Sequence, residues 1–333
     1  MGNRLVAGLS LAVGLLVMAC GPVPQRTGTP MLPSGFGALI PNAPLDAYVY
    51  LDQAEPFVFR SGEGAKTGTP ALGLPDTLMV DSVALWTDVG GETPVVAVRI
   101  DMTDPRLIPA LVQQISNASK GSTTPVWTLQ QGDVLNVVMG SGSKASAYEQ
   151  VMRGNDYVGL RDTHPRVWSS AQALPMDPPE PPIGIGYVNI SDRVIDYLAK
   201  QGKPTAAEAA TLDRLKPVLR QAGIAHAVFA AYGPSLPVLH PEVDLEVLWR
   251  QPYSGVVVFD SRLPAPVLDF LFHAAIGGAD LERLTVSGLT TYVLPSRAGS
   301  VLVQNAGRTL VLAGGTDRKA AVGLLGTVDA AEQ

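Results

Sequence analysis

Apolar residues follow two regular spacings along most of this chain. Short runs rich in Val and Tyr are bounded by Gly, Pro, Asn and Asp, a pattern typical of β-strands. They occupy residues 47–52, 80–86, 95–101, 134–139, 186–192, 243–249, 256–260 and 309–314. An i, i+1, i+4, i+5, i+8 apolar stripe begins at Leu107 and again at Val267, and it predicts two amphipathic helices.

The strand spacing favours hairpins. Short turns at Gln131-Gly132 and Ser287-Gly288 separate neighbouring runs, and consecutive strands joined in this way build antiparallel sheets. We therefore predict an α+β fold of two related repeats, each a mostly antiparallel sheet with helices on one face.

The repeats are predicted from motifs that keep their order in both halves. The matching pairs are 47–52 with 186–192, 80–86 with 243–249, and 95–101 with 256–260. Asp101 and Asp260, which end the third pair, are each followed four residues later by Pro. We expect both to cap the helices that follow. The preserved order indicates a duplication.

Two stretches rich in Pro divide the chain. Residues 20–36 predict a Pro/Gly-rich tether, and residues 176–183 predict a Pro-rich linker. The first α+β domain is then expected at 37–175 and the second at 184–330, which suits a chain longer than a single core usually organises.

The second half carries an additional helical pair. Ser191 is predicted to cap a helix over residues 192–201 that stops at Gly202. The capping-box sequence Thr205-Ala206-Ala207-Glu208 begins another helix, which Gly223 is expected to end.

The first nineteen residues are typical of an export signal. Arg4 precedes an apolar run over 5–19, which is shorter than the ~20 residues that a spanning helix needs. The ending Leu16-Val17-Met18-Ala19-Cys20 resembles the lipobox of bacterial lipoproteins. That resemblance implies that cleavage before Cys20 makes it the new N-terminus, and that it carries diacylglycerol and further acyl chains such as palmitate. The lipid would anchor the protein at the extracytoplasmic face of a bacterial cell membrane. The alternative is an ordinary signal peptide that ends near a cysteine.

The composition limits the kinds of partner that the protein can bind. The net charge of −6 becomes −7 when cleavage removes Arg4, and no basic cluster offsets it, so nucleic acid is excluded as a partner. Cys20 is the single cysteine, which leaves no thiol for a disulfide or a thiolate metal site. The partners expected are the membrane, through lipid on Cys20, and an unknown envelope protein or ligand.

A scattered set of motifs resembles the penicillin-recognising enzymes. Ser141-Gly142-Ser143-Lys144 matches S-x-x-K, Tyr187-Val188-Asn189 matches a Tyr-x-Asn variant, and Lys66-Thr67-Gly68 matches KTG. KTG here precedes the serine instead of following it, and the serine motif repeats as a helix start around Gly315. We therefore predict a structural cap and no catalytic residues.

The remaining polar residues predict no metal site and no cofactor. Glu242, Asp244 and Glu246 share one side of a strand. They are interpreted as a solvated face, with a Ca²⁺ site as the alternative. His164, His226 and His273 lack the spacing of metal ligands, and His273 is expected to be a partly buried core residue.

The opening Tyr-Val strand with its Asp, the repeated strand-helix units and Leu174-Pro175 together resemble a group of uncharacterised bacterial extracytoplasmic proteins with a duplicated domain of unknown function. The sequence thus predicts a lipid-anchored envelope protein with a non-enzymatic role in binding or interaction. The alternatives are an envelope hydrolase with an unrecognised site and a structural spacer lipoprotein.

Overall fold

One antiparallel sheet of twelve strands forms the body of the protein. The computed structural model describes residues 32–52, 80–90, 94–120, 122–176, 182, 184–202, 216–217, 219–232, 254–276, 281–296, 299–315 and 318–332. The predicted signal, Cys20, the Lys66-Thr67-Gly68 motif and the strand expected at 243–249 lie outside these residues. No helix of the described ranges is long and apolar enough to cross a membrane.

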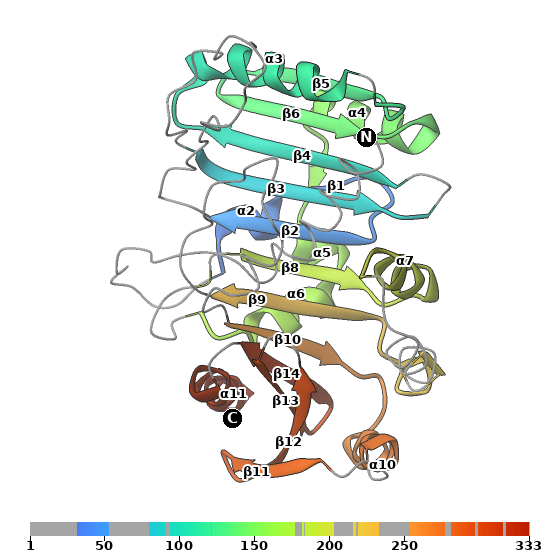
Figure 1. The fold of residues 1–333 in the computed structure, drawn as a ribbon, viewed down its shortest axis with the longest axis vertical. Coiled ribbons are helices and arrows are strands. Elements are labelled where there is room, and N and C mark those ends of the chain that lie inside the picture. Colours follow the sequence, from blue (N-terminus) through green and yellow to red (C-terminus); the bar gives the residue numbers. More distant parts are fainter. Residues whose placement is uncertain are drawn as a thin grey trace, which may run out of the picture.

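The sheet passes without a break through both predicted halves of the chain (Figure 1). Its strands lie in the order β11 (Glu282–Val286), β12 (Leu289–Ser296), β13 (Gly299–Ala306), β14 (Thr309–Gly315), β10 (Ser254–Asp260), β9 (His226–Tyr232), β8 (Gly184–Asn189), β2 (Ala47–Asp52), β3 (Val80–Asp88), β4 (Val95–Met102), β6 (Val134–Met139) and β5 (Val126–Gln131). Every neighbouring pair is antiparallel. The prediction of an α+β fold with a mostly antiparallel sheet is confirmed.

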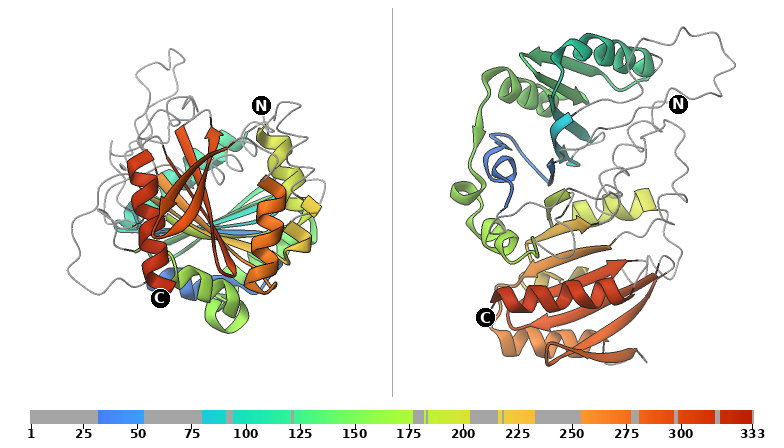
Figure 2. Two further views of the ribbon diagram at one scale, coloured as in Figure 1. Left: turned by 90° about the horizontal axis from the view of Figure 1, so that it is seen from below. Right: turned by 90° about the vertical axis from the view of Figure 1, so that its left-hand side faces the viewer.

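Helices cover both faces of the sheet. On one face lie α2 (Ser34–Ala38), α4 (Gly142–Gly154), α5 (Leu160–Thr163), α6 (Pro165–Gln172) and α11 (Arg318–Glu332). The opposite face carries α3 (Ile108–Ser119) and α10 (Ala265–Ile276). In the right-hand view of Figure 2, α4, α5 and α6 follow one another along one side of the sheet.

The prediction that helices lie on one face is therefore wrong. Tyr48 and Val49 are neighbours on β2 and point to opposite faces, yet both are buried. Tyr48 packs in the same cluster as Tyr148 of α4, whereas Val49 packs in the same cluster as Ile108 of α3. Strands that are apolar on both sides require cover on both faces.

The remaining elements are short or lie beside the sheet. They are a pair of two-residue strands, β1 (Ile40–Pro41) and β7 (Tyr157–Val158), the 3-10 turn η1 (Pro105–Leu107) and the helix α7 (Asp192–Gly202).

A group of aromatic rings fills the middle of the face that carries α2. Phe36 stacks on Tyr48 at 5.4 Å between centroids, Tyr48 stacks on Trp86 at 6.1 Å, and Tyr187 meets Tyr48 edge-on at 6.2 Å. All four side chains are fully buried. Phe36 thus belongs to the core, so the predicted tether does not extend to residue 36. Tyr187 comes from the second half, so the rings join the halves.

Several local turn and capping signals are confirmed. The Ser191 hydroxyl accepts a hydrogen bond from the backbone N–H of Val194 at 3.3 Å, which caps α7. Gly223 ends a helical segment with φ of 64°. Ser287 and Gly288 have φ of 50° and 82° in the turn between β11 and β12, as a tight primed hairpin turn requires. These signals were readable because each depends on one or two residues.

The predicted cap at Asp101 is wrong. Its carboxylate accepts hydrogen bonds from the Ser82 hydroxyl at 2.6 Å and from Arg99 at 3.0 Å, because Asp101 still belongs to β4. Asp104 caps the following turn instead, accepting from the backbone N–H of Arg106 at 3.0 Å.

The predicted domain boundary at 176–183 is crossed by the sheet. β2 and β8 pair along five residues, from Ala47 opposite Val188 to Leu51 opposite Gly184. The strand pairing does not itself mark a division between domains, and the boundary stays a prediction.

Gly186 tests how tightly this central pair is packed. A Cβ at this position would collide with the Phe229 ring and with the backbone oxygen of Tyr48. We expect Gly186→Ala to reduce the free energy of unfolding by about 1–3 kcal/mol in a urea titration. The control is Gly323→Ala in α11, where a Cβ meets no atom within 4 Å. There we expect no loss, or a gain of up to about 1 kcal/mol from helix propensity. Equal effects at both glycines would contradict the packing described.

Candidate functional site

A groove of about 520 Å³ opens between α6 and the sheet. From α6 and the residue after it come Arg166, Ser169, Ser170, Gln172 and Ala173. The sheet side is lined by Val258 and Asp260 of β10 and by Arg308 and Thr309 at the turn into β14. We call this the α6 groove.

The position of α6 follows from its sequence. Pro165 occupies the first helical position, where its missing N–H costs no hydrogen bond. Val167 and Ala171, one turn apart, are buried in the cluster that includes the sheet residues Val256 and Val258. This anchoring leaves the guanidinium of Arg166 and the hydroxyl of Ser169 on the exposed side, where they line the groove.

The opposite wall is held by hydrogen bonds between the ends of two strands. The backbone N–H of Ser261 donates to the carbonyl of Arg308 at 3.0 Å, and the Arg308 guanidinium donates back to the carbonyl of Ser261 at 3.3 Å. Gly307, with φ of 66°, makes the turn that presents Arg308. The Arg308 guanidinium is thereby held at the residue that follows Asp260, and both side chains line the groove.

The charges that line the groove are not neutralised by one another. The Arg166 side chain makes no hydrogen bond or ion pair with any residue that the structure describes, and neither does the carboxylate of Asp260. Among the described residues, the Arg308 guanidinium hydrogen-bonds only to the neutral carbonyl of Ser261. Two guanidinium groups against one carboxylate leave the lining with one net positive charge.

A buried histidine lies behind Ser170. His226 begins β9 and is 7% exposed, and its Nε2 lies 3.5 Å from the Ser170 hydroxyl. Burial lowers the pKa of His226, and Arg166 adds to that effect, while Asp260 acts in the opposite direction. The imidazole is therefore neutral near pH 7. Sequence reasoning had placed no role on His226, since its spacing to other residues carries no signal.

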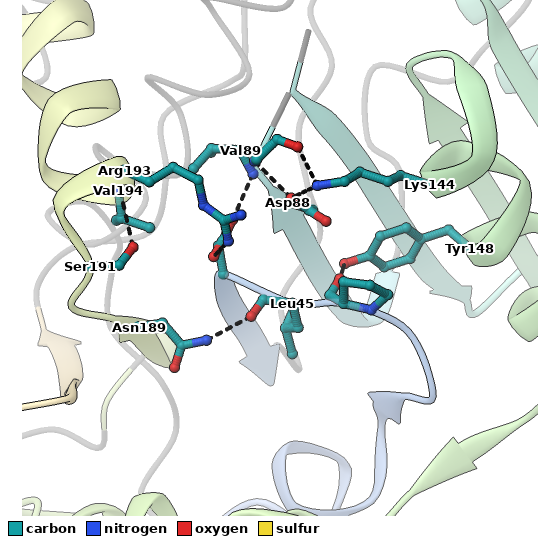
Figure 3. A network of polar contacts seen from close by, with 12 residues as sticks. Leu45, Asp88, Val89, Lys144, Tyr148, Asn189, Ser191, Arg193 and Val194 are labelled. Carbon is teal, nitrogen blue, oxygen red and sulfur yellow. Dashed lines mark hydrogen bonds and ion pairs between the residues drawn. The ribbon is translucent and has the colours of Figure 1, made fainter. Parts of the chain in front are cut away.

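A second polar group lies where the two halves of the chain meet (Figure 3). We call Asp46, Asp88, Lys144 and Arg193 the junction cluster. Asp46 is 3% exposed and accepts from the backbone N–H of Val89 at 2.9 Å and from the Arg193 guanidinium. It ties α7, in the second half, to the strand ends of the first.

In Asp88, the other carboxylate of the junction cluster, only one of the two oxygens accepts hydrogen bonds from described residues. Asp88 is 1% exposed, and its Oδ1 accepts from the backbone N–H of Gly90 at 2.7 Å and from Lys144 Nζ at 2.6 Å. Its Oδ2 is buried without a hydrogen-bond partner among the described residues. Lys144 also donates to the carbonyl of Gly90, so its ammonium supplies the counter-charge of Asp88.

The two penicillin-recognising motifs within the described residues have structural roles. Ser141 is exposed before α4 and makes no side-chain capping bond, while Lys144 is engaged with Asp88. Tyr187 is fully buried in the aromatic core. Lys144 is thus a structural residue of the junction.

The other candidate ligands form no metal site among the described residues. Glu242, Asp244 and Glu246 lie outside the described residues. Across the ranges that the structure covers, no three His, Cys, Asp or Glu side chains are grouped to hold a metal ion. His273 was expected to be a partly buried core residue, but its side chain is 47% exposed on α10, where its Nδ1 lies 2.9 Å from the Tyr292 hydroxyl. The buried residue of that turn is Phe272.

Comparisons with known proteins add a distant structural likeness. No protein-family model and no curated protein matches the chain. Among solved structures, the chain is similar to crystal form I of TP0453, with a TM-score of 0.35 and 8% sequence identity, over 86% of this chain and 94% of that one. A likeness at this level says nothing about function.

The junction cluster predicts a stability effect for Lys144. In Lys144→Met, Asp88 stays buried without its cation, so we expect the free energy of unfolding to fall by about 2–4 kcal/mol. The double variant Lys144→Met/Asp88→Asn removes the unpaired charge and should recover part of the loss. The control is Arg318→Met, which breaks an exposed pair with Glu282 and should change stability by at most about 1 kcal/mol. Similar losses for Lys144→Met and Arg318→Met would contradict the role of the cluster.

Burial of His226 predicts a pH dependence. Because the folded state lowers the pKa of this side chain, the unfolded chain binds the proton more readily. The contribution to stability is complete above the ordinary pKa of about 6.5 and is lost as the pH falls below it. We expect unfolding free energies measured between pH 8 and pH 5 to fall less steeply for His226→Asn than for the wild type. Parallel slopes in the two proteins would contradict a buried, neutral His226.

Proposed function

We propose that this chain is a lipid-anchored envelope protein that binds a ligand outside the cytoplasmic membrane without catalysing a reaction. The anchor is supported by Cys20, which directly follows the apolar run 5–19 and its preceding Arg4. The observation that carries the binding role is the α6 groove.

The groove lies where the two predicted domains meet. α6 belongs to the first predicted domain by sequence, at 37–175, yet it packs on β9 and β10 of the second. Ligand sites occur preferentially at such interfaces between domains. With its volume of about 520 Å³, the groove falls within the range of small-molecule sites, roughly 300–1,000 Å³.

We further propose that the fold arose by duplication. Counted outward from the centre of the sheet, the first five strands are β2, β3, β4, β6 and β5 on one side and β8, β9, β10, β14 and β13 on the other, where β12 and β11 follow. A helix follows the third strand of each series, α3 or α10, and another follows the last hairpin, α4 or α11. This shared order supports the proposal. It pairs β3 with β9, whereas the sequence motif paired residues 80–86 with 243–249.

A hydrolase is the second candidate, favoured by one contact. The hydroxyl of Ser170 lies 3.5 Å from His226 Nε2, and Asp260 follows the residue that pairs with Ala227 across the sheet. Against this role, Ser170 lies inside α6. Its neighbouring backbone N–H groups are used by the helix and form no oxyanion hole. A purified protein that hydrolysed p-nitrophenyl acetate, with loss in Ser170→Ala, would favour this candidate over the binding role.

The anchor is tested by comparing the wild type with Cys20→Ser. We expect the wild type to sediment with membranes and to show an intact mass raised by two or three acyl chains, because several chains hold a protein firmly. Cys20→Ser should lose the added mass and should no longer depend on detergent for release. Wild-type protein found free in the medium without acyl mass would contradict the anchor.

A further inference from the structure

We propose that the α6 groove takes a small molecule that carries an oxyanion, a carboxylate or a phosphoryl group, between Arg166 and Arg308. This inference rests on the proposed binding function and adds the chemical class of the ligand.

The two arginines supply the recognition. The Arg166 side chain makes no hydrogen bond or ion pair with a described residue, and the Arg308 guanidinium donates one N–H to the carbonyl of Ser261. A guanidinium presents five donors in a planar fork that matches carboxylate and phosphate oxygens. In a chain of net charge −6, two such forks facing one groove favour an anion there.

The wall residues near the arginines favour a polar ligand over a bare ion. Ser169 and Thr309 add hydroxyls to the lining, which donate to oxygen or accept from N–H and O–H groups. Asp260 is an acceptor only, so it suits a ligand that carries hydroxyl or amino groups besides its anion. The volume of the groove also exceeds what a single ion needs.

Asp101, the residue of the first half that matches Asp260, has its charge neutralised by a neighbouring arginine. Asp101 is the next-to-last residue of β4, and Asp260 is the last residue of β10. Arg99, two residues before Asp101 on the same strand, pairs with Asp101 at 3.0 Å. The residue two positions before Asp260 is Val258. Asp260 therefore has no cation on its own strand, and the charges around it come from α6 and the β14 turn, which are the walls of the groove.

The test uses ligands of similar size that differ in charge. The full lipidated chain in detergent is titrated, at constant ionic strength, with glucose 6-phosphate, gluconate, glucose and glucosamine, and binding is followed by saturation-transfer difference NMR. We expect one or both anions to bind and the neutral and cationic sugars not to bind. Arg166→Gln and Arg308→Gln should each weaken binding by about tenfold, the loss of one charge-assisted contact.

Two further variants locate the binding. Arg161→Gln removes an exposed arginine of α5 that is not part of the groove lining, and it should leave the affinity unchanged. Ser169→Trp fills the groove and should abolish binding. Loss of affinity in Arg161→Gln equal to that in Arg166→Gln would overturn the proposed site.

The outcomes separate the ligand class from the binding role. If glucose or glucosamine binds, the anions do not, and Ser169→Trp abolishes the binding, the groove is a ligand site and the oxyanion inference is overturned. If no probe binds, or if Ser169→Trp leaves all binding unchanged, both the inference and the binding role assigned to the groove are overturned.

The same experiment identifies the source of the oxyanion. Short-chain phosphatidylglycerol is added to the micelles together with the bound anion. Displacement of the anion, sensitive to Arg166→Gln, assigns the oxyanion to a lipid headgroup. Retention of the anion assigns it to a free solute. Both results keep the oxyanion at the two arginines.

Discussion

β2 and β8 pair antiparallel at the centre of the sheet, and the other elements are arranged around this pair. Without it, each half would expose a long, flat, apolar edge strand, which is a template for aggregation. Tyr187 against Tyr48 on one face, and Phe229 over Gly186 on the other, bury the pair from both sides. The two halves therefore stabilise each other through one uninterrupted set of backbone hydrogen bonds.

The junction cluster adds orientation to this pairing. Two nearly buried carboxylates are costly to remove from water unless cations and N–H groups surround them. Asp46 meets that requirement only when α7 brings Arg193 from the second half, and Asp88 only when α4 brings Lys144. A different placement of either helix would leave a buried charge unpaired. The cluster therefore disfavours alternative placements more than it adds to net stability.

The sequence was most informative where structure depends on neighbouring residues. The Ser191 cap, the Ser287-Gly288 turn and the strand at 134–139 were predicted because propensity and capping act over a few positions. The placement of the helices was not predicted correctly, because strands that are apolar on both sides do not indicate which helix covers which face. β9 was not predicted, because the sequence comparison matched residues 80–86 with 243–249 instead.

The residues of the α6 groove could not be predicted from the sequence for a related reason. Arg166, Asp260 and Arg308 are separated by 94 and 48 positions in the sequence, and neither arginine belongs to a motif. They meet because β10, β14 and α6 share one face. The only sequence hint was Asp260, which matched Asp101 and was interpreted as a helix cap.

Under the duplication that we propose, corresponding helices of the two halves are placed differently. α4 and α11 hold corresponding places after the last hairpin of each half. After α4, the chain continues through α5 and α6, which lie across the boundary on β9 and β10. α11 instead packs on β10, β13 and β14 of its own half. The crossing of α6 sets an arginine of the first half opposite an arginine of the second, a combination that neither half contains by itself. Recognition at this groove would then depend on the packing of α6 on β9 and β10, because that packing brings the two guanidinium groups to one groove.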